Sequence, residues 1–264
     1  MRLHEAFAKA RADGRAALVG YLPAGFPTVD GGIAAMRSMV EAGVDVVEVG
    51  LPYSDPLMDG PVIQQAVDAA LAGGTTTPDV LRTVEAVAAT GVPAVVMTYW
   101  NPVLRYGPER FARELADAGG VGVITPDLIP DEAEDWLPAA RAADVDTVFL
   151  VAPSSSDERI ALTVAACRGF VYAASTMGVT GTREQVSGAA SGLVARVRAA
   201  TDLPVAVGLG VSSGDQAAEV AGFADGVIVG SAFVRRLLAA PDPVTGAAAV
   251  ATLAGELSDG VRRR

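Results

Sequence analysis

Eight apolar segments, rich in β-branched residues, recur along the chain with helical stretches between them. They cover residues 17–22, 44–49, 94–99, 121–125, 147–151, 170–174, 204–208 and 226–229. Continuously apolar strands that alternate with helices indicate a parallel sheet covered by helices. Eight such repeats in 264 residues favour a closed (β/α)8 barrel over an open sheet. The sequence therefore predicts an α/β fold.

The intervening segments carry helix signals. Residues 3–12 predict an extra amphipathic N-terminal helix, with Leu3 and Phe7 on one side. A helix is expected over residues 78–89, with Thr77 as its N-cap and Pro78 in its first position. Others are expected from Gly107-Pro108 onward, over 131–143 and over 190–200. No linker or charge block divides the chain, so residues 1–264 are expected to form a single barrel domain.

Composition excludes several classes of protein. Hydrophobic residues make up 51% of the chain, but no stretch approaches the roughly 20 unbroken apolar residues of a membrane span. The first residues lack the apolar core of a signal peptide, and the single cysteine, Cys167, fits a reducing compartment. We therefore expect a cytoplasmic protein without membrane contact. A net charge of −11 argues against a nucleic-acid partner and is explained by a solvated acidic surface.

Two residue types are nearly missing. The only histidine is His4 and the only lysine is Lys9, and both lie in the predicted N-terminal helix. Histidine catalytic triads, histidine-ligated zinc and Schiff-base lysines therefore lack a suitable residue, and no metal site is expected. Chemistry in this chain must rest on carboxylates, tyrosines, hydroxyls and backbone amides.

Two carboxylates stand out near the end of the second predicted strand. Glu48 interrupts an apolar, β-branched stretch, and Asp59 follows on a turn-rich loop. Alternation along the strand directs Val46 and Glu48 into the barrel, and Val47 and Val49 toward the helices. A buried Glu is costly unless it is paired with an Arg or uses a raised pKa in acid–base chemistry. Asp59 before a glycine is either a turn residue or the second member of a catalytic pair.

A second group is rich in glycine. The seventh strand ends in a run that contains Gly208 and Gly210, and the eighth ends at Gly230-Ser231. Ser231 is expected to cap a helix over residues 232–238. Barrels of this kind often hold a phosphate between these two loops and a helix N-terminus, although glycines also serve turns alone. The pattern predicts a phosphate site that involves Gly210, Gly230 and Ser231.

Three tyrosines fall on predicted strands, although aromatic residues make up only 5% of the chain. Tyr21 ends the first strand, Tyr99 ends the third, and Tyr172 lies in the sixth. Packing in the core, with the hydroxyl hydrogen-bonded, is the simplest role for any one of them. A substrate-lining role is the alternative.

The run from Glu48 to Pro61 resembles the active-site strand and loop of the tryptophan synthase alpha family, whose pattern is close to E-L-G-x-P-F-S-D-P-x-A-D-G-P. Val49, Tyr53 and Met58 replace the commonest residues, and both acids are kept. The M-T-Y-x-N-P stretch at residues 97–102, G-V-T-G at 178–181, and the glycines after the last two strands follow in family order.

This resemblance implies a lyase that cleaves indole-3-glycerol phosphate to indole and glyceraldehyde 3-phosphate. Glu48 would transfer protons, and Asp59 would accept a hydrogen bond from the indole N–H. Tyr21 and Tyr172 would line the pocket, joined by Tyr99. The segment 176–181 would be a lid.

In that lid, Thr180 would contact substrate and the Gly181 amide would reach the phosphate, together with Gly210, Gly230 and Ser231. No cofactor is expected in this chain. The partner would be a beta subunit carrying pyridoxal phosphate, in an α2β2 complex docked through residues 52–56 and 101–102.

Three alternatives stay open at this stage. A different phosphosugar barrel enzyme, such as an isomerase, would share the phosphate loops but would need another base. A stand-alone lyase would release free indole. A catalytically idle subunit that only activates a partner would not need the intact Glu48 and Asp59.

Overall fold

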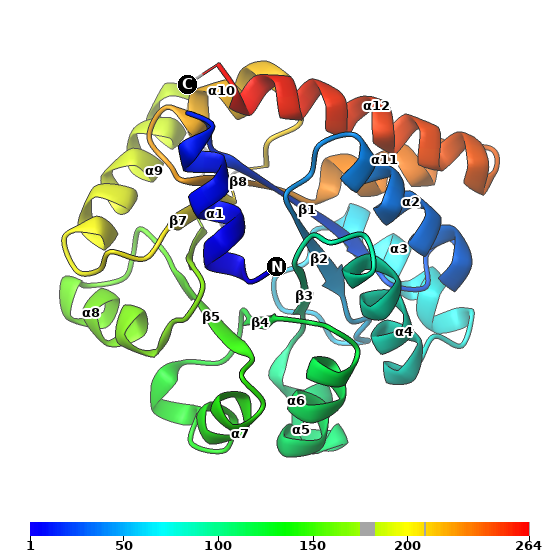
Figure 1. Cartoon of the computed structure of the whole chain (residues 1–264), viewed down its shortest axis with the longest axis horizontal. Helices are drawn as coiled ribbons and strands as arrows, with labels where there is room; N and C mark the ends of the chain where they lie inside the picture. Colours follow the sequence, from blue (N-terminus) through cyan, green and yellow to red (C-terminus); the bar gives the residue numbers. More distant parts are fainter. Residues whose placement is uncertain (175–182, 209, 264) are drawn as a thin grey trace.

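The fold is a closed barrel of eight parallel strands, each hydrogen-bonded to the next, with β8 pairing back to β1. The computed structural model describes residues 1–174, 183–208 and 210–263. For residues 183–187 it describes the backbone but not the side chains. The strands are β1 (Ala17–Pro23), β2 (Val46–Gly50), β3 (Ala94–Met97), β4 (Gly122–Thr125), β5 (Asp146–Val151), β6 (Val171–Ala174), β7 (Val205–Gly208) and β8 (Gly226–Val229). The predicted α/β barrel is confirmed, and the helices surround it in Figure 1.

The remaining elements follow the strands in alternation. They are α1 (Leu3–Ala12), α2 (Val29–Glu41), α3 (Pro61–Ala72), α4 (Thr77–Ala88), α5 (Trp100–Tyr106), α6 (Pro108–Asp117), the 3₁₀ turn η1 (Pro130–Glu132), α7 (Trp136–Ala142), α8 (Asp157–Ala166), α9 (Arg183–Arg198), α10 (Gly214–Ala221), α11 (Ser231–Ala239) and α12 (Pro243–Val261). None of the described helices is long and apolar enough to cross a membrane.

Two apolar cores reflect the two faces of the strands. Val46 belongs to the core inside the barrel, whereas Val47 and Val49 belong to the core between the barrel and its helices. All three side chains are fully buried. The alternation predicted along β2 is therefore confirmed, and it directs Glu48 into the barrel.

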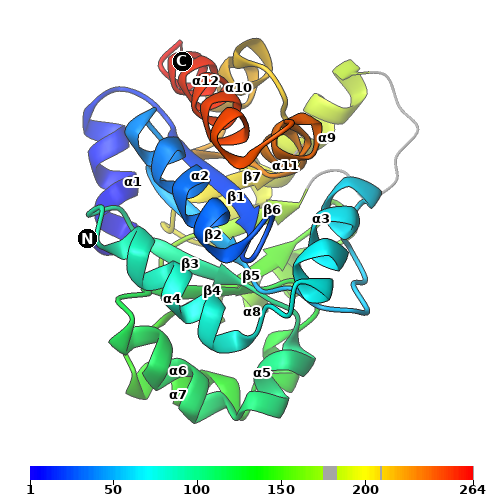
Figure 2. The same cartoon turned by 90° about the vertical axis from the view of Figure 1, so that its right-hand side faces the viewer.

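Helix α1 closes the N-terminal end of the barrel. Its buried residues Leu3, Ala6 and Phe7 join the inner core, and the Phe7 ring lies 5.3 Å from the ring of Phe170. Figure 2 shows α1 at one end of the barrel and α3 at the other. The predicted extra helix thus fills the end opposite the carboxyl ends of the strands.

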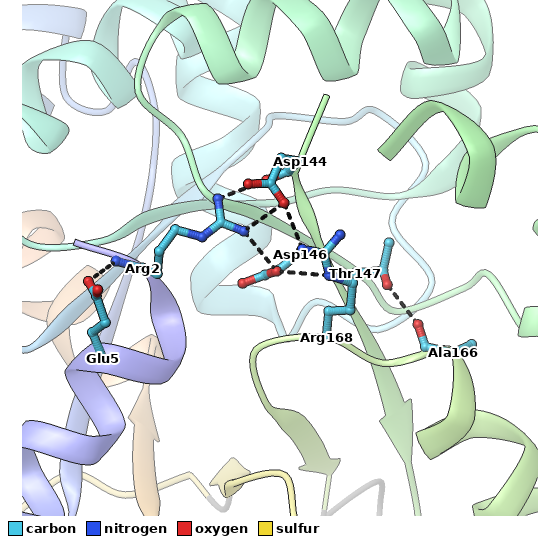
Figure 3. Close-up of polar contacts among 7 residues, drawn as sticks. All are labelled: Arg2, Glu5, Asp144, Asp146, Thr147, Ala166 and Arg168. Carbon is cyan, nitrogen blue, oxygen red and sulfur yellow. Dashed lines mark hydrogen bonds and ion pairs between the residues drawn. The ribbon is translucent and has the colours of Figure 1, made fainter. Parts of the chain in front are cut away.

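Ion pairs fix α1 to the barrel (Figure 3). Arg2, the N-cap of α1, lies 3.1 Å from the buried Asp146 carboxylate and donates to the Asp144 carbonyl at 2.8 Å. Arg168 lies 3.3 Å from the same Asp146 carboxylate and donates a hydrogen bond to the Asp144 carboxylate. Asp146 begins β5, so the start of the chain is tied to the middle of the barrel sheet.

Two helix predictions were wrong in detail. Helix α4 has Thr76 rather than Thr77 as its N-cap, because the Asp79 carboxylate accepts hydrogen bonds from the Thr76 amide and hydroxyl. Residues 131–143 form η1 and then α7, not one helix. Proline has no N–H, so Pro138 fits only the first turn of α7.

Candidate active site

A cavity of about 280 Å³ opens at the carboxyl ends of the strands. It brings together side chains from several strands and from the loops that follow them. Its described lining is Tyr21, Glu48, Met58, Asp59, Gly60, Ile63, Met97, Leu150, Tyr172, Ala174, Gly208, Gly210, Ile228, Gly230 and Ser231. A larger hollow of about 530 Å³ lies on the outer surface at α6 and α7, but no strand-end residue lines it. The strand-end cavity is therefore the candidate site.

Glu48 is a buried, isolated acid in this cavity. Its side chain is 1% exposed, and Oε1 has no hydrogen-bond partner among the described residues. Burial raises its pKa to about 8. No arginine pairs with it in the described part of the chain, so an ion-pair role is not what keeps this carboxyl in the core.

Asp59 approaches the cavity from the loop between β2 and α3. The Tyr99 hydroxyl donates to Asp59 Oδ1 at 3.1 Å, and Gln64 Nε2 donates to the Asp59 carbonyl at 2.6 Å. Burial raises the pKa of Asp59, and the hydrogen bond from Tyr99 opposes that rise. The side chain is partly exposed, so Asp59 ionises more readily than Glu48.

Tyr21 and Tyr172 line the cavity from two different strands, β1 and β6. Each ring occupies space that a glycine leaves on the neighbouring strand. An added Cβ at Gly50 or Gly208 would lie 2.5 Å from the Tyr21 or Tyr172 hydroxyl, respectively. Burial, followed by the charges of Asp59 and Glu48, raises the pKa of Tyr21 well above its ordinary value. Burial and Glu48 likewise raise the pKa of Tyr172. Both phenols stay neutral hydrogen-bond donors near pH 7.

Tyr99 lies just outside this lining. Strand β3 ends at Met97 rather than at Tyr99, and Tyr99 is the N-cap of α5. Its side chain is 5% exposed, and its hydroxyl contacts the loop that carries Asp59. Among the described residues, the hydrogen bonds of the Tyr99 hydroxyl are therefore with Met58 and Asp59 of that loop.

The glycine-rich end of the cavity meets a helix N-terminus. Gly210 has φ of +66°, a conformation that favours glycine. Gly230 is the N-cap of α11 and Ser231 is its first residue, so the prediction of Ser231 as the cap was wrong by one position. No acidic residue lies in the first turn of α11. Backbone N–H groups and the helix dipole favour an anion there. Thr180 and Gly181, predicted to join this end, lie outside the described residues.

Sequence reasoning missed the apolar part of the cavity. Met97, Leu150 and Ile228 line it from three strands. Ile228 belongs to the inner core, as do Val95 and Val148. Met97 and Leu150 follow those two valines by two residues, so their side chains also point into the barrel. Applying to every strand the alternation used for β2 would have found them. The two glycines that make room for tyrosines leave no comparable pattern in the sequence.

The arrangement combines an apolar chamber, two acids with different environments, and an end suited to a phosphate. When their environments give two carboxyl groups different pKa values, one can stay protonated while the other is ionised, and the two can take different catalytic roles. Among the described residues, no cluster of histidine, cysteine, aspartate or glutamate could hold a metal ion.

Comparison with known proteins decides the family. The family model described as "Tryptophan synthase alpha chain" matches residues 7–262. The chain belongs to the tryptophan synthase alpha chain family. It is therefore a carbon–carbon lyase that cleaves indole-3-glycerol phosphate to indole and glyceraldehyde 3-phosphate, the alpha reaction of L-tryptophan biosynthesis.

Relatives and solved structures agree along the whole length. The tryptophan synthase alpha chain of Salinispora tropica is 64% identical over 261 residues, covering 99% of this chain and 98% of the relative. That of Salinispora arenicola is 66% identical over 257 residues, covering 97% and 96%. A structure of Mycobacterium tuberculosis tryptophan synthase superposes with a TM-score of 0.91 at 58% identity, covering 99% and 98%. The family identity excludes an unrelated phosphosugar enzyme, and it implies a beta-subunit partner.

Proposed function

We propose that Glu48 is the proton-transfer residue of the alpha reaction. The observation that supports this assignment is a carboxyl that is 1% exposed and has no partner for Oε1 among the described residues. This burial raises its pKa to about 8. Such a group holds its proton at neutral pH and can release it within a catalytic cycle. The apolar chamber supplies the environment that raises the pKa.

The proton balance follows from the substrate. Glu48 gives its proton to C3 of the indole ring, which makes the ring an electron sink. The resulting carboxylate takes the proton of the glycerol hydroxyl as the carbon–carbon bond breaks. The hydroxyl carbon becomes the aldehyde, the electrons of the broken bond return to the ring, and indole leaves neutral. Glu48 is protonated again at the end. No lysine or metal is needed as the sink.

Asp59 is assigned the stabilising role. The protonated ring carries positive charge, and a carboxylate that accepts a hydrogen bond from the indole N–H stabilises it most in the transition state. The partly exposed position of Asp59 and its hydrogen bond from Tyr99 keep it easier to ionise than Glu48. Tyr21 and Tyr172 flank the ring.

The phosphate is assigned to the glycine-rich end. The amides near Gly210 and the N-terminus of α11, at Gly230 and Ser231, supply donors without a basic side chain among the described lining residues. Thr180 and Gly181 are assigned to the same end by the family pattern.

The beta partner is proposed to dock on the face that carries the site, as an α2β2 complex in the cytoplasm. Pyridoxal phosphate is assigned to the beta chain. Leu57, Leu104 and Ile129 support this face as an interface, because they are 76%, 48% and 43% exposed on segments that follow three adjacent strands. Large exposed apolar side chains that gather in one region favour protein contact.

The test is release of indole from indole-3-glycerol phosphate in the presence of beta chain. Glu48→Gln keeps the shape and removes the proton transfer, so turnover should fall by about 10²–10⁴. Asp59→Asn should also be severely impaired. Glu41→Gln on α2 and Asp68→Asn on α3, both exposed, are matched controls that should retain activity.

In the wild type, kcat/KM should decline as the pH rises above about 8, where Glu48 loses its proton. Turnover within threefold of wild type in either site variant would remove that residue from the mechanism.

A further inference from the structure

The loop between β2 and α3 holds Asp59, and one tyrosine outside the cavity anchors that loop. The Tyr99 hydroxyl donates to Asp59 Oδ1 at 3.1 Å and accepts a hydrogen bond from the Met58 amide at 2.9 Å. It therefore contacts two consecutive residues of the loop, one through the catalytic carboxylate and one through the backbone. A single hydroxyl with a donor and an acceptor contact fixes both the position and the orientation of the carboxyl group.

The tyrosine itself lies on a firm support. It is the N-cap of α5, and the next amide, that of Trp100, donates to both Asp127 carboxylate oxygens, at 2.9 and 3.2 Å. The Trp100 ring lies 6.2 Å from the ring of the fully buried Trp136. The start of α5 is thus held from the β4 side of the barrel, and the Tyr99 hydroxyl extends from it toward the loop after β2.

A second contact joins the same loop to the same helix. The Tyr53 ring lies 5.6 Å from the Tyr99 ring, and the Tyr53 hydroxyl accepts a hydrogen bond from Asn101 Nδ2 at 2.9 Å. Phenylalanine at position 53 could make the ring contact but not the hydrogen bond. The loop is therefore attached to α5 at both of its ends.

We propose that Tyr99 is a positioning residue of the lyase reaction, whose hydroxyl holds the Asp59 carboxylate in place, with Tyr53 and Asn101 as a second attachment. The inference rests on the proposed role of Asp59. Tyr99 acts through Asp59 and touches no reacting atom.

The same hydrogen bond favours the ionised form of Asp59. Burial raises the pKa of Asp59, and the bond from Tyr99 lowers it. The titratable side chains near Asp59 include Tyr99, the neutral phenol of Tyr21, and Glu48 in the same cavity. Loss of the Tyr99 hydroxyl must raise the pKa of Asp59, so the carboxylate needed for charge stabilisation becomes scarcer at low pH.

The experiment compares Tyr99→Phe with Tyr106→Phe, measured with saturating beta chain from pH 5.5 to 8.5. Tyr106 lies on the same helix, and its hydroxyl also donates to a carboxylate, that of Glu114, away from the cavity. In Tyr99→Phe, kcat/KM should fall about ten- to a hundredfold at pH 6 and recover part of that loss by pH 8, because the acid limb moves to higher pH. Tyr106→Phe should follow the wild-type profile. Tyr53→Phe should show a smaller loss of the same form.

Two outcomes would overturn the inference. One is a Tyr99→Phe loss that is uniform across pH, which indicates general structural damage. The other is an unchanged profile. A Tyr99→Phe, Asp59→Asn double variant should be no slower than Asp59→Asn alone, and a further loss would indicate direct contact with substrate. If Asp59→Asn itself keeps wild-type turnover, the proposed role of Asp59 fails, and that result is distinct from a failure of Tyr99 alone.

Discussion

Glu48 is a residue whose burial works against folding. In the unfolded chain a glutamate ionises near its ordinary pKa of 4.5, whereas in the folded chain burial raises its pKa to about 8. Between these values the folded state keeps a proton that the unfolded state has released. The free energy of unfolding therefore decreases as the pH rises through this window, and the cost stays constant above it. A shift from 4.5 to about 8 corresponds to about 5 kcal/mol.

This cost predicts that Glu48→Gln stabilises the protein. Glutamine does not titrate, so the stability difference between the variant and wild type should be small near pH 4.5 and grow to a few kcal/mol by pH 8. Urea unfolding at several pH values measures it. Glu41→Gln, at an exposed position on α2, should show no such growth. A difference that does not change with pH would contradict a raised pKa at Glu48.

A single functional residue can be identified from the sequence when its type breaks the pattern of the segment around it. Glu48 was predictable because a carboxylate interrupts an apolar strand. The contact between Tyr99 and Asp59 was not, because 40 residues separate them and their meeting depends on the path of an irregular loop. The same holds for Gly50 and Gly208, whose role as space for tyrosine rings appears only once neighbouring strands are paired.

Helix α11 is the element that prepares the phosphate end. It begins at Ser231 beside the cavity, and its first turn contains no acidic side chain. Oriented amides at a helix N-terminus favour an anion without a lysine. The site therefore needs little from side chains at this end, and it should be sensitive to any negative charge placed there.

Ser231→Asp should weaken substrate binding. A carboxylate close to the phosphate repels it and competes for the same amides, so KM should rise by roughly tenfold or more. Ser156→Asp, at the N-cap of α8 and outside the cavity lining, introduces the same charge as a control. Steady-state kinetics and titration with glycerol phosphate measure the effect. An unchanged KM, or a phosphate bound elsewhere in a soaked crystal, would refute the assignment.

The strands were predictable in number, and the elements were predictable in kind more than in their exact ends. Continuously apolar strands separated by helix signals indicate a parallel sheet covered on both faces, and eight repeats favour its closure into a barrel. The start of α4 depends on which of three consecutive threonines pairs with Asp79, and the capping geometry selects Thr76. The break between η1 and α7 follows from Pro138, because a residue without an amide hydrogen fits only the first turn of a helix.

The whole molecule has two ends with different tasks. At the N-terminal end, α1 and the ion pairs of Arg2 and Arg168 with Asp146 close the barrel. At the other end lie the cavity, the loop of Asp59 and the exposed Leu57. A partner that binds this second end contacts the loop attached to α5 by Tyr53 and Tyr99. Association can therefore change the position of Asp59.

Addition of beta chain should raise the rate of indole formation. The isolated alpha chain is expected to be a weak lyase. Saturation with beta chain should increase turnover without adding a cofactor to this chain, because contact at this end is expected to position the Asp59 loop. Turnover with and without beta chain, together with gel filtration of the mixture, measures this. Equal activity and no complex would instead indicate a stand-alone lyase that releases indole.

The closure of the barrel by α1 has a practical consequence. The sequence contains one lysine, Lys9, which is exposed on that helix. Reagents that couple to the lysine side chain would therefore attach at the closed end. A resin, a sensor chip or a fluorescent dye joined in this way would leave the opposite end facing the solution, in a uniform orientation and with the natural sequence unchanged.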